Sequence, residues 1–289
     1  MPPVRKIYAP KSEVMGIDPG PSGLAYFHPQ KAGLIRVALN VDMQEKAIRR
    51  LQRKIDRSRR VNNPDHFNVD GRAKPSPTSW KISRRMEKLQ VKLAEHYRCL
   101  AATRKRDHGE LANFLLQRAG TIKIEKNSYR SYQRNFGKST TRTGMGAFVS
   151  HLKRSAERAN SQVIELNAYE LKLSQYDPAT DTYRKKALKE RWHRWGETDI
   201  LVQRDVMSAF LACHATEKGH DRTCLLNEWA TAEALLSDSG LCRHELRNDQ
   251  GTSKEVSRLT SPEVEKPKER VRSLSRTLCA KGDVKPSAA

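Results

Sequence analysis

The sequence has no paired cysteines, no long apolar run and too few acidic residues to balance its basic ones. Its five cysteines are scattered without a Cys-x-x-Cys pair: Cys99, Cys213, Cys224, Cys242 and Cys279. This spacing argues against a disulfide framework or a four-cysteine zinc ribbon and suits a reducing compartment. No apolar stretch approaches the roughly 20 residues of a membrane span, and MPPVRKIYAP (1–10) lacks the apolar core of a secretion signal. We therefore expect a cytoplasmic protein without a membrane partner.

Positive charge dominates the composition. The 289 residues include 55 Lys and Arg but only 33 Asp and Glu, which gives a formal charge of +22 and a pI near 10.0. A chain with this charge repels itself unless a polyanion neutralises it, so the composition favours a nucleic-acid partner and a nucleoid-associated protein. A basic structural protein, or a surface that is simply solvated, is the alternative. The length suits one large domain, or a core domain with extensions.

The first strands are predicted over residues 14–41. VMGID (14–18) is an apolar run that ends in a carboxylate, and PGPSG (19–23) reads as a turn. LAYF (24–27) and GLIRVALNV (33–41) continue the strand pattern. A short Gly- and Pro-rich connection between strands predicts an antiparallel start to the sheet.

Two long helices are predicted to follow as a hairpin inserted at about 44–118. Residues 44–60 place Ile48, Leu51 and Ile55 on one face, while the remaining positions hold eight Lys or Arg against two acids. This excess favours contact with a phosphate backbone over a merely solvated face. After a polar loop (61–79), apolar residues at helical spacing predict a helix that continues to about Gln117: Ile82, Met86, Leu89, Leu93, Tyr97 and Leu100.

The second half of the chain alternates between strand and helix patterns. TIKIEK (121–126) and SQVIELN (161–167) are predicted strands, and 127–143 is predicted as a basic, hydroxyl-rich loop. Two helices are predicted from their apolar faces, one with Met145, Phe148, Val149, Leu152 and Ala156, and one near Arg204 with Val206, Ala209, Phe210 and Cys213.

The predicted organisation is a short lead (1–13), an α/β domain (14–217) with an irregular segment at 168–196, an amphipathic helix within 218–242, and a disordered basic tail (243–289). The tail is rich in Ser, Lys, Arg and Pro and poor in apolar residues, so it cannot bury a core.

Three carboxylates stand at informative places. Asp18 and Glu125 end predicted strands, and Asp205 opens a predicted helix. Each alone is ordinary, because a strand-ending Asp commonly forms a turn and an early helical Asp interacts well with the helix dipole. Together they can converge on two divalent cations. Mg²⁺ prefers oxygen ligands and keeps waters that leave room for phosphate oxygens.

The motifs around these carboxylates resemble those of a known family. GIDPGPSGLAYF (16–27) resembles the first RuvC motif, IKIEKNSY (122–129) the second and QRDVMSAFLA (203–212) the third. Their order, with a basic hairpin between the first two, is similar to the transposon-encoded TnpB family and to compact type V CRISPR effectors, over roughly residues 14–215.

This resemblance implies an RNase H-like (RuvC-type) α/β fold with a mixed sheet, flanking helices and an inserted hairpin. It implies an RNA-guided DNA endonuclease that uses Mg²⁺, or alternatively Mn²⁺, with Asp18, Glu125 and Asp205 as catalytic metal ligands. DNA and a guide RNA would be the partners. The residues expected on the nucleic-acid surface are Arg49, Arg50, Arg53, Lys54, Arg57 and Arg204.

The sequence departs from the family pattern in two places. Only 13 residues precede Val14, whereas TnpB-like chains usually carry well over a hundred residues of recognition region there. This fits a truncated copy, a subunit, or a protein whose recognition role lies elsewhere. The usual zinc ribbon is replaced by LSQYDPATDTYRKKALKERWH (173–193), in which His193, Asp177 and Asp181 are poor substitutes for four cysteines. We expect a ribbon-like loop without structural zinc.

Two other functions stay open: a nucleic-acid-binding protein without nuclease activity, and a structure-specific nuclease that needs no guide. Three further patterns point elsewhere only weakly. FGKST (136–140) resembles the end of a P-loop, but Tyr132 occupies the place of its first Gly. A second group, Cys213, His214, His220 and Cys224, fits no common ribbon spacing, and Trp80, Trp192 and Trp195 suit base stacking or core packing equally well.

Overall fold

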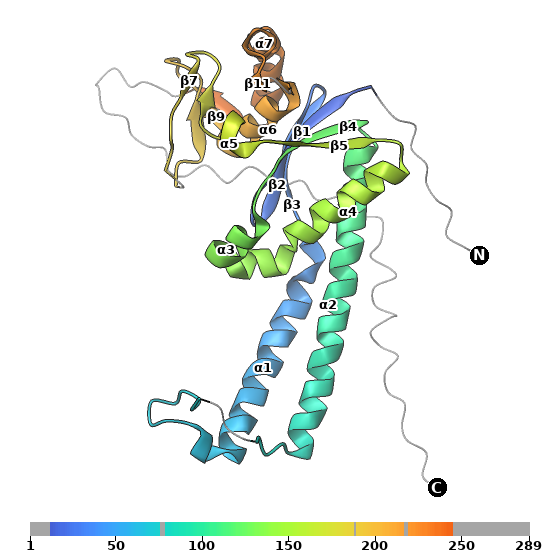
Figure 1. Cartoon of the computed structure of the whole chain (residues 1–289), viewed down its shortest axis with the longest axis vertical. Helices are drawn as coiled ribbons and strands as arrows, with labels where there is room; N and C mark the ends of the chain where they lie inside the picture. Colours follow the sequence, from blue (N-terminus) through green and yellow to red (C-terminus); the bar gives the residue numbers. More distant parts are fainter. Residues whose placement is uncertain (1–11, 76–78, 188, 217–218, 245–289) are drawn as a thin grey trace, which may run out of the picture.

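A mixed five-stranded sheet forms the centre of the protein. The computed structural model describes residues 12–75, 79–187, 189–216 and 219–244. The strand order is β3-β2-β1-β4-β5 (Figure 1). The antiparallel part comprises β1 (Val14–Pro19), β2 (Gly23–His28) and β3 (Lys31–Arg36), and the parallel part continues from β1 to β4 (Thr121–Glu125) and β5 (Gln162–Leu166). The prediction of an α/β fold whose sheet starts antiparallel is confirmed.

Helices cover both faces of this sheet because side chains alternate along each strand. Met15, Ile17, Ile122 and Ile124 point to one face, where they share a buried cluster with the end of α2 (Arg84–Leu116) and with α4 (Met145–Arg158). The opposite face packs against α6 (Arg204–His214) and α7 (Arg222–Asp238). The buried faces predicted for α4 and α6 are confirmed, and α7 is a helix within the predicted segment 218–242.

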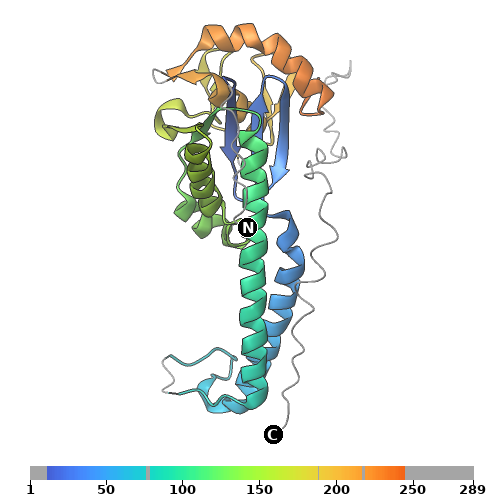
Figure 2. The ribbon, with the colours of Figure 1, turned by 90° about the vertical axis from the view of Figure 1, so that its right-hand side faces the viewer.

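The hairpin projects from one end of the sheet as two long helices, α1 (Asp42–Asn62) and α2 (Figures 1 and 2). It is entered through a short 3-10 turn, η1 (Leu39–Val41). Two residues of the predicted apolar face are exposed, Ile82 by 49% and Tyr97 by 46%. Among the described residues, each helix of the outer hairpin packs only against the other, so the buried seam between them is narrow. The helix also begins later than predicted, because the Ser83 side chain accepts the Met86 N–H and caps it.

Asn63 links the end of α1 to the segment before α2 by side-chain hydrogen bonds at the hairpin tip, just before η2 (Pro64–His66). It is 4% exposed, its amide donates to the carbonyls of Arg59 and Lys81, and its side-chain oxygen accepts the Lys81 N–H. Because Asn63→Ala leaves these groups without their partner, we expect a local loss of about 1 kcal/mol. Amide exchange over 59–84 should accelerate, whereas Asn68→Ala, at a position where backbone groups make the turn, should leave it unchanged. Equal exchange in both variants would contradict the role.

The loop predicted over 127–143 is wrong, because this segment forms α3 (Tyr129–Thr143). The Ser128 side chain caps its start by accepting the Ser131 N–H, and Gly144 ends it in the left-handed region at φ 61°. Thr143 is its one buried residue among those described, so the helix offers no apolar stripe for sequence analysis to detect. Phe136 is not helical (φ −132°, ψ 37°) and kinks it.

The irregular segment predicted over 168–196 contains short elements: α5 (Ala168–Leu171), the β6–β7 hairpin (Tyr176–Asp177 with Thr182–Tyr183) and β8 (Trp192–Arg194). A small sheet of order β12-β9-β8 adds β9 (Ile200–Gln203) and β12 (Cys242–His244). A further hairpin pairs β10 (Ala215–Thr216) with β11 (Gly219–His220). The predicted tail therefore starts too early, because residues 243–244 pair with β9; its remainder lies outside the described residues, as do residues 1–11 of the predicted lead.

No helix within the described ranges is both long and apolar enough to cross a membrane.

Candidate active site

Strand alternation sends Asp18 and Glu125 to the same face of the sheet. Ile17 pairs with Ile124 in the parallel register of β1 and β4, and both of these side chains lie in the core on the α2 and α4 side. The next residue on each strand therefore points to the α6 side, and adjacent strands lie about 4.8 Å apart. Asp18 and Glu125 thus stand side by side at the carboxyl ends of the two strands.

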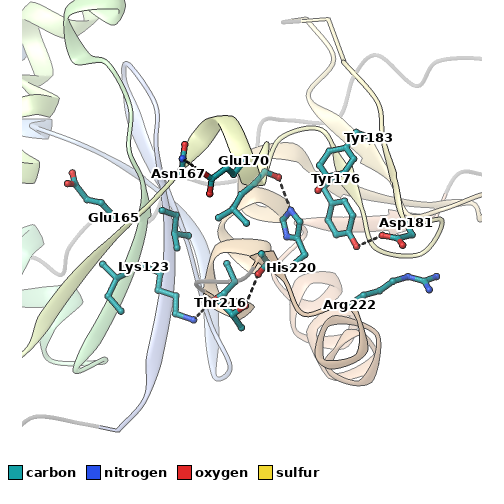
Figure 3. A pocket seen from close by; sticks show the side chains of 15 residues that line it. Lys123, Glu165, Asn167, Glu170, Tyr176, Asp181, Tyr183, Thr216, His220 and Arg222 are labelled. Carbon is teal, nitrogen blue, oxygen red and sulfur yellow. Dashed lines mark hydrogen bonds between the residues drawn. The ribbon is translucent and has the colours of Figure 1, made fainter.

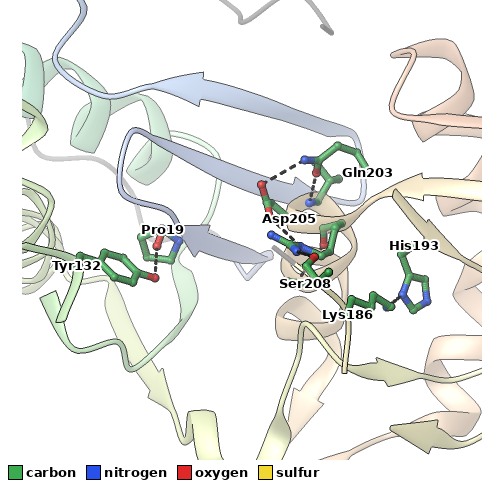
Figure 4. Close-up of polar contacts among 10 residues, drawn as sticks. Pro19, Tyr132, Lys186, His193, Gln203, Asp205 and Ser208 are labelled. Carbon is green, nitrogen blue, oxygen red and sulfur yellow. Dashed lines mark hydrogen bonds and ion pairs between the residues drawn. The ribbon is translucent and has the colours of Figure 1, made fainter. Parts of the chain in front are cut away.

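Asp205 reaches this face from the first turn of α6. The helix begins at Arg204 because the Gln203 side chain accepts the Val206 N–H at 2.7 Å. The amide of Gln203 also donates to Asp205 at 3.2 Å, and the Arg204 guanidinium lies 3.5 Å from the same carboxylate (Figure 4). One short segment, Gln203–Asp205, therefore starts the helix and orients its carboxylate.

The three carboxylates interact electrostatically. Burial raises the pKa of Asp18 well above its ordinary value, and the negative charges of Asp205 and Glu125 raise it further. The Arg204 charge and a hydrogen bond from Ser208 act in the opposite direction but do not compensate. Burial also raises the pKa of Glu125, against hydrogen bonds from Asn127 and from the Leu173 backbone. The structure thus brings the predicted triad together as a cluster with excess negative charge.

Two tyrosines of α3 border this cluster. The Tyr132 hydroxyl donates to the Pro19 carbonyl at 3.1 Å, one residue from Asp18 (Figure 4). The Tyr129 ring packs edge-on against the Tyr132 ring, with 5.9 Å between their centroids. Burial raises the pKa of both tyrosines, and the nearby carboxylates raise it further, so the hydroxyls stay protonated. Sequence analysis missed these two tyrosines because it predicted a loop over 127–143. Ser128, a favourable helix N-cap residue, was the available signal for a helix.

The donor set suits a hard divalent cation. Within the described residues, no group of three or more His, Cys, Asp and Glu side chains is close enough to enclose one ion. Mg²⁺ does not need such an enclosure, because it keeps several waters and binds proteins through one or two carboxylates. Asp18, Glu125 and Asp205 supply only oxygen atoms, and the negative charges of Asp205 and Glu125, which add to burial in raising the pKa of Asp18, are charges that a cation would neutralise.

The predicted nucleic-acid residues lie in two places. Five are exposed on α1, away from the sheet: Arg49, Arg50, Arg53, Lys54 and Arg57 (Figure 1). Of these, Arg49 pairs with Glu45, and the Arg57 guanidinium donates to the Arg53 carbonyl. Arg204 instead lies beside the carboxylates, with only 14% of its side chain exposed, and also donates to the Ala187 carbonyl.

The remaining candidate residues are dispersed. Cys224 contacts His214 at 3.5 Å, whereas His220 stacks on Tyr176, so the Cys–His group does not assemble. FGKST lies within α3 rather than in a loop after a strand. Burial and the Lys186 charge lower the pKa of His193 to about 3, so its ring is neutral.

The three tryptophans considered for base stacking make different packing contacts. Trp195 stacks on Trp229 in the core at 3.6 Å. Arg59 lies over the Trp80 ring and Arg243 over the Trp192 ring, at 4.9 and 4.1 Å. These contacts cover ring faces for which the sequence had favoured base stacking and core packing equally.

Comparison with known proteins gives little beyond this geometry. No protein-family model and no curated protein matches the chain. Among solved structures, it is similar to a chain of the "Cryo-EM structure of the Cas12f1-sgRNA-target DNA complex", with a TM-score of 0.45 and 12% sequence identity. The match covers 71% of this chain and 39% of that one, so the chain spans well under half of the protein it matches.

Proposed function

We propose that the protein is an RNase H-like, RuvC-type nuclease of the TnpB kind that hydrolyses DNA with Mg²⁺ or Mn²⁺. The observation that carries the proposal is the placement of Asp18, Glu125 and Asp205 at one face of the sheet, where burial and then the charges of Asp205 and Glu125 raise the pKa of Asp18. The sheet supports it, since its antiparallel half precedes its parallel half and the long hairpin is inserted between β3 and β4.

Each group around the site has a separate role in this mechanism. Bound Mg²⁺ would activate the attacking water and stabilise the leaving oxygen. Asp18 and Glu125 would bind metal ions from adjacent strand ends, and Asp205 would contribute from α6, where Gln203 and Arg204 fix the orientation of its carboxylate. Arg204 also adds positive charge where a phosphate would lie. The protonated Tyr129 and Tyr132 close the opposite side and offer no competing negative charge.

The basic face of α1 is the proposed surface for a guide RNA and its DNA target. Its exposed arginines and Lys54 form a row on a helix that the sheet does not cover (Figure 2). Contacts with phosphates are independent of sequence, so base pairing with the guide would supply the specificity.

Metal removal tests the chemistry. We expect the purified full chain to cleave labelled DNA with Mg²⁺ or Mn²⁺, to lose that activity completely in EDTA, and to recover it when the metal is restored. Products should be followed on denaturing gels. Cleavage that persists in the chelator would contradict the metal-dependent mechanism, and binding without cleavage in either metal would leave only a nucleic-acid-binding protein.

Sequencing the RNA that copurifies with the chain tests the guide. A discrete RNA species, whose removal abolishes cleavage of matching DNA, is the expected result. Cleavage of branched DNA by RNA-free protein would instead identify a structure-specific nuclease.

A further inference from the structure

A cavity of about 900 Å³ opens beside the edge of the sheet, between β4 and β5 on one side and the β6–β7 and β10–β11 hairpins on the other (Figure 3). The side chains that matter here are Lys123, Asn167, Glu170, Tyr176, Tyr183 and His220. A cavity of this size is in the range that holds drug-sized ligands. None of these residues belongs to the carboxylate cluster.

Aromatic rings form one wall of the cavity. The His220 ring stacks on Tyr176 at 3.9 Å with an interplanar angle of 8°, and the Tyr176 hydroxyl donates to Asp181 (Figure 3). Tyr183 pairs with Tyr176 across the hairpin, its ring centroid 5.0 Å away, yet it is 51% exposed. Tyr176 is thus held rigidly, and Tyr183 and His220 retain ring surface for a planar ligand.

His220 also presents a hydrogen-bond acceptor without a protein partner. Its Nε2 lies 2.7 Å from the Leu171 carbonyl, which can only accept, so Nε2 carries the proton. Burial lowers the pKa of His220, and in the neutral ring Nδ1 is then an acceptor. Nδ1 is buried and has no hydrogen-bond partner in the part of the chain that is described. A ligand that brings an N–H group would satisfy it, and the Glu170 carboxylate offers a second acceptor.

We propose that this cavity holds an unpaired nucleobase of a single strand whose backbone passes the carboxylates. A nucleobase has the flat face that Tyr183 and His220 can stack on and the exocyclic N–H groups that the acceptors require. A base inside a duplex is already paired and stacked, so it cannot enter. The cavity would thus select single-stranded substrate.

The position of the cavity fits a neighbour of the cleaved phosphate. Lys123 lines the cavity and Glu125 follows two residues later on the same face of β4, about 7 Å along the strand. Leu171 also lines the cavity, and the Leu173 N–H bonds to the Glu125 carboxylate. A phosphate at the carboxylates therefore brings an adjacent base within reach. This substrate assignment rests on the proposed nuclease function, but base binding itself does not need cleavage.

The test measures binding in EDTA, where cleavage cannot interfere, with a single-stranded oligonucleotide that carries 5-iodouracil. Ultraviolet crosslinking followed by mass spectrometry should place the base on residues 173–184 or on His220. Stacking on one aromatic ring contributes about 1–3 kcal/mol per base, so Tyr183→Ala should weaken binding about tenfold. Tyr183→Trp should retain both affinity and crosslink. Tyr169→Ala is the matched control, because Tyr169 is 88% exposed nearby but does not line the cavity.

The opposing outcomes are equally specific. Crosslinks confined to α1, or equal loss of affinity in Tyr183→Ala and Tyr169→Ala, would overturn the proposal. A free mononucleotide that displaces the oligonucleotide from 173–184 at lower concentration than the strand itself would assign the cavity to a soluble nucleotide instead. If the crosslink is present but no variant or wild-type protein cleaves DNA in Mg²⁺, the nuclease proposal fails while the base site stands.

Discussion

Replacing Asp18 by Asn is expected to slow DNA cleavage about a thousandfold, the upper range for losing one group that stabilises charge in the transition state. Asp18 is the carboxylate whose pKa is raised by burial and by the charges of both Asp205 and Glu125, so it lies near both. The neutral amide keeps the shape of the side chain but cannot balance a cation. Single-turnover cleavage with saturating protein measures the loss, and binding in EDTA should change by less than about twofold, since nucleic-acid affinity depends mainly on basic contacts.

The same variant should be more stable than the wild-type protein when no metal is present. In the unfolded chain Asp18 ionises at its ordinary pKa, whereas in the folded protein its pKa is well above that value. The folded state therefore loses stability as pH rises from the unfolded pKa through the folded one. Asn removes this cost, so the Tm in EDTA should rise. Added Mg²⁺ should stabilise the wild-type protein more than the variant.

Asp65→Asn is the control for both measurements, because Asp65 is an exposed carboxylate at the hairpin tip. It should change neither cleavage nor the difference in Tm between EDTA and Mg²⁺. An Asp18→Asn protein that cleaves at the wild-type rate, or that responds to Mg²⁺ as the wild-type protein does, would remove Asp18 from the proposed metal site.

The carboxylates were accessible to sequence analysis because strands have a fixed period. An apolar run that ends in Asp or Glu fixes which face that carboxylate takes, and the parallel pairing of Ile17 with Ile124 then places Asp18 beside Glu125. Asp205 followed from the apolar face of α6, which leaves its first turn at the edge of the sheet. Local patterns therefore specified where the three carboxylates lie once the pairing of the strands was known.

Other features depend on tertiary contacts that no local pattern carries. The helix α3, with the two tyrosines that border the carboxylates, was missed. It has one buried residue among those described, so its sequence shows no helical periodicity of apolar residues. The exposure of Ile82 and Tyr97 arises because no third element of the described chain packs against the outer hairpin. The proposed base site joins Tyr176 to His220, which lie on different hairpins and meet only in the folded chain.

Gly16→Ala is expected to cause the largest loss of stability, about 3 kcal/mol or more, at the top of the range for overpacked cores. Gly16 lies in the middle of β1, where α6 crosses the strand. A Cβ added there would overlap the Ala209 carbonyl oxygen and lie 2.5 Å from the Cys213 amide nitrogen. Both are backbone atoms of α6, so no side-chain rotation can relieve the overlap, and the helix must move away from the sheet.

That movement links the stability of the core to the site. Asp18 is two residues from Gly16 on the same face of β1, and Asp205 is one turn before Ala209 on α6. Any Gly16→Ala protein that folds should therefore hold its carboxylates farther apart, with a lower Tm, weaker Mg²⁺ stabilisation and slower cleavage. Gly137→Ala is the matched control, since its Cβ would meet no atom of the described residues within 4 Å and Ala favours a helix over Gly. Equal melting temperatures for the two variants would show that α6 does not need the close approach that the glycine permits.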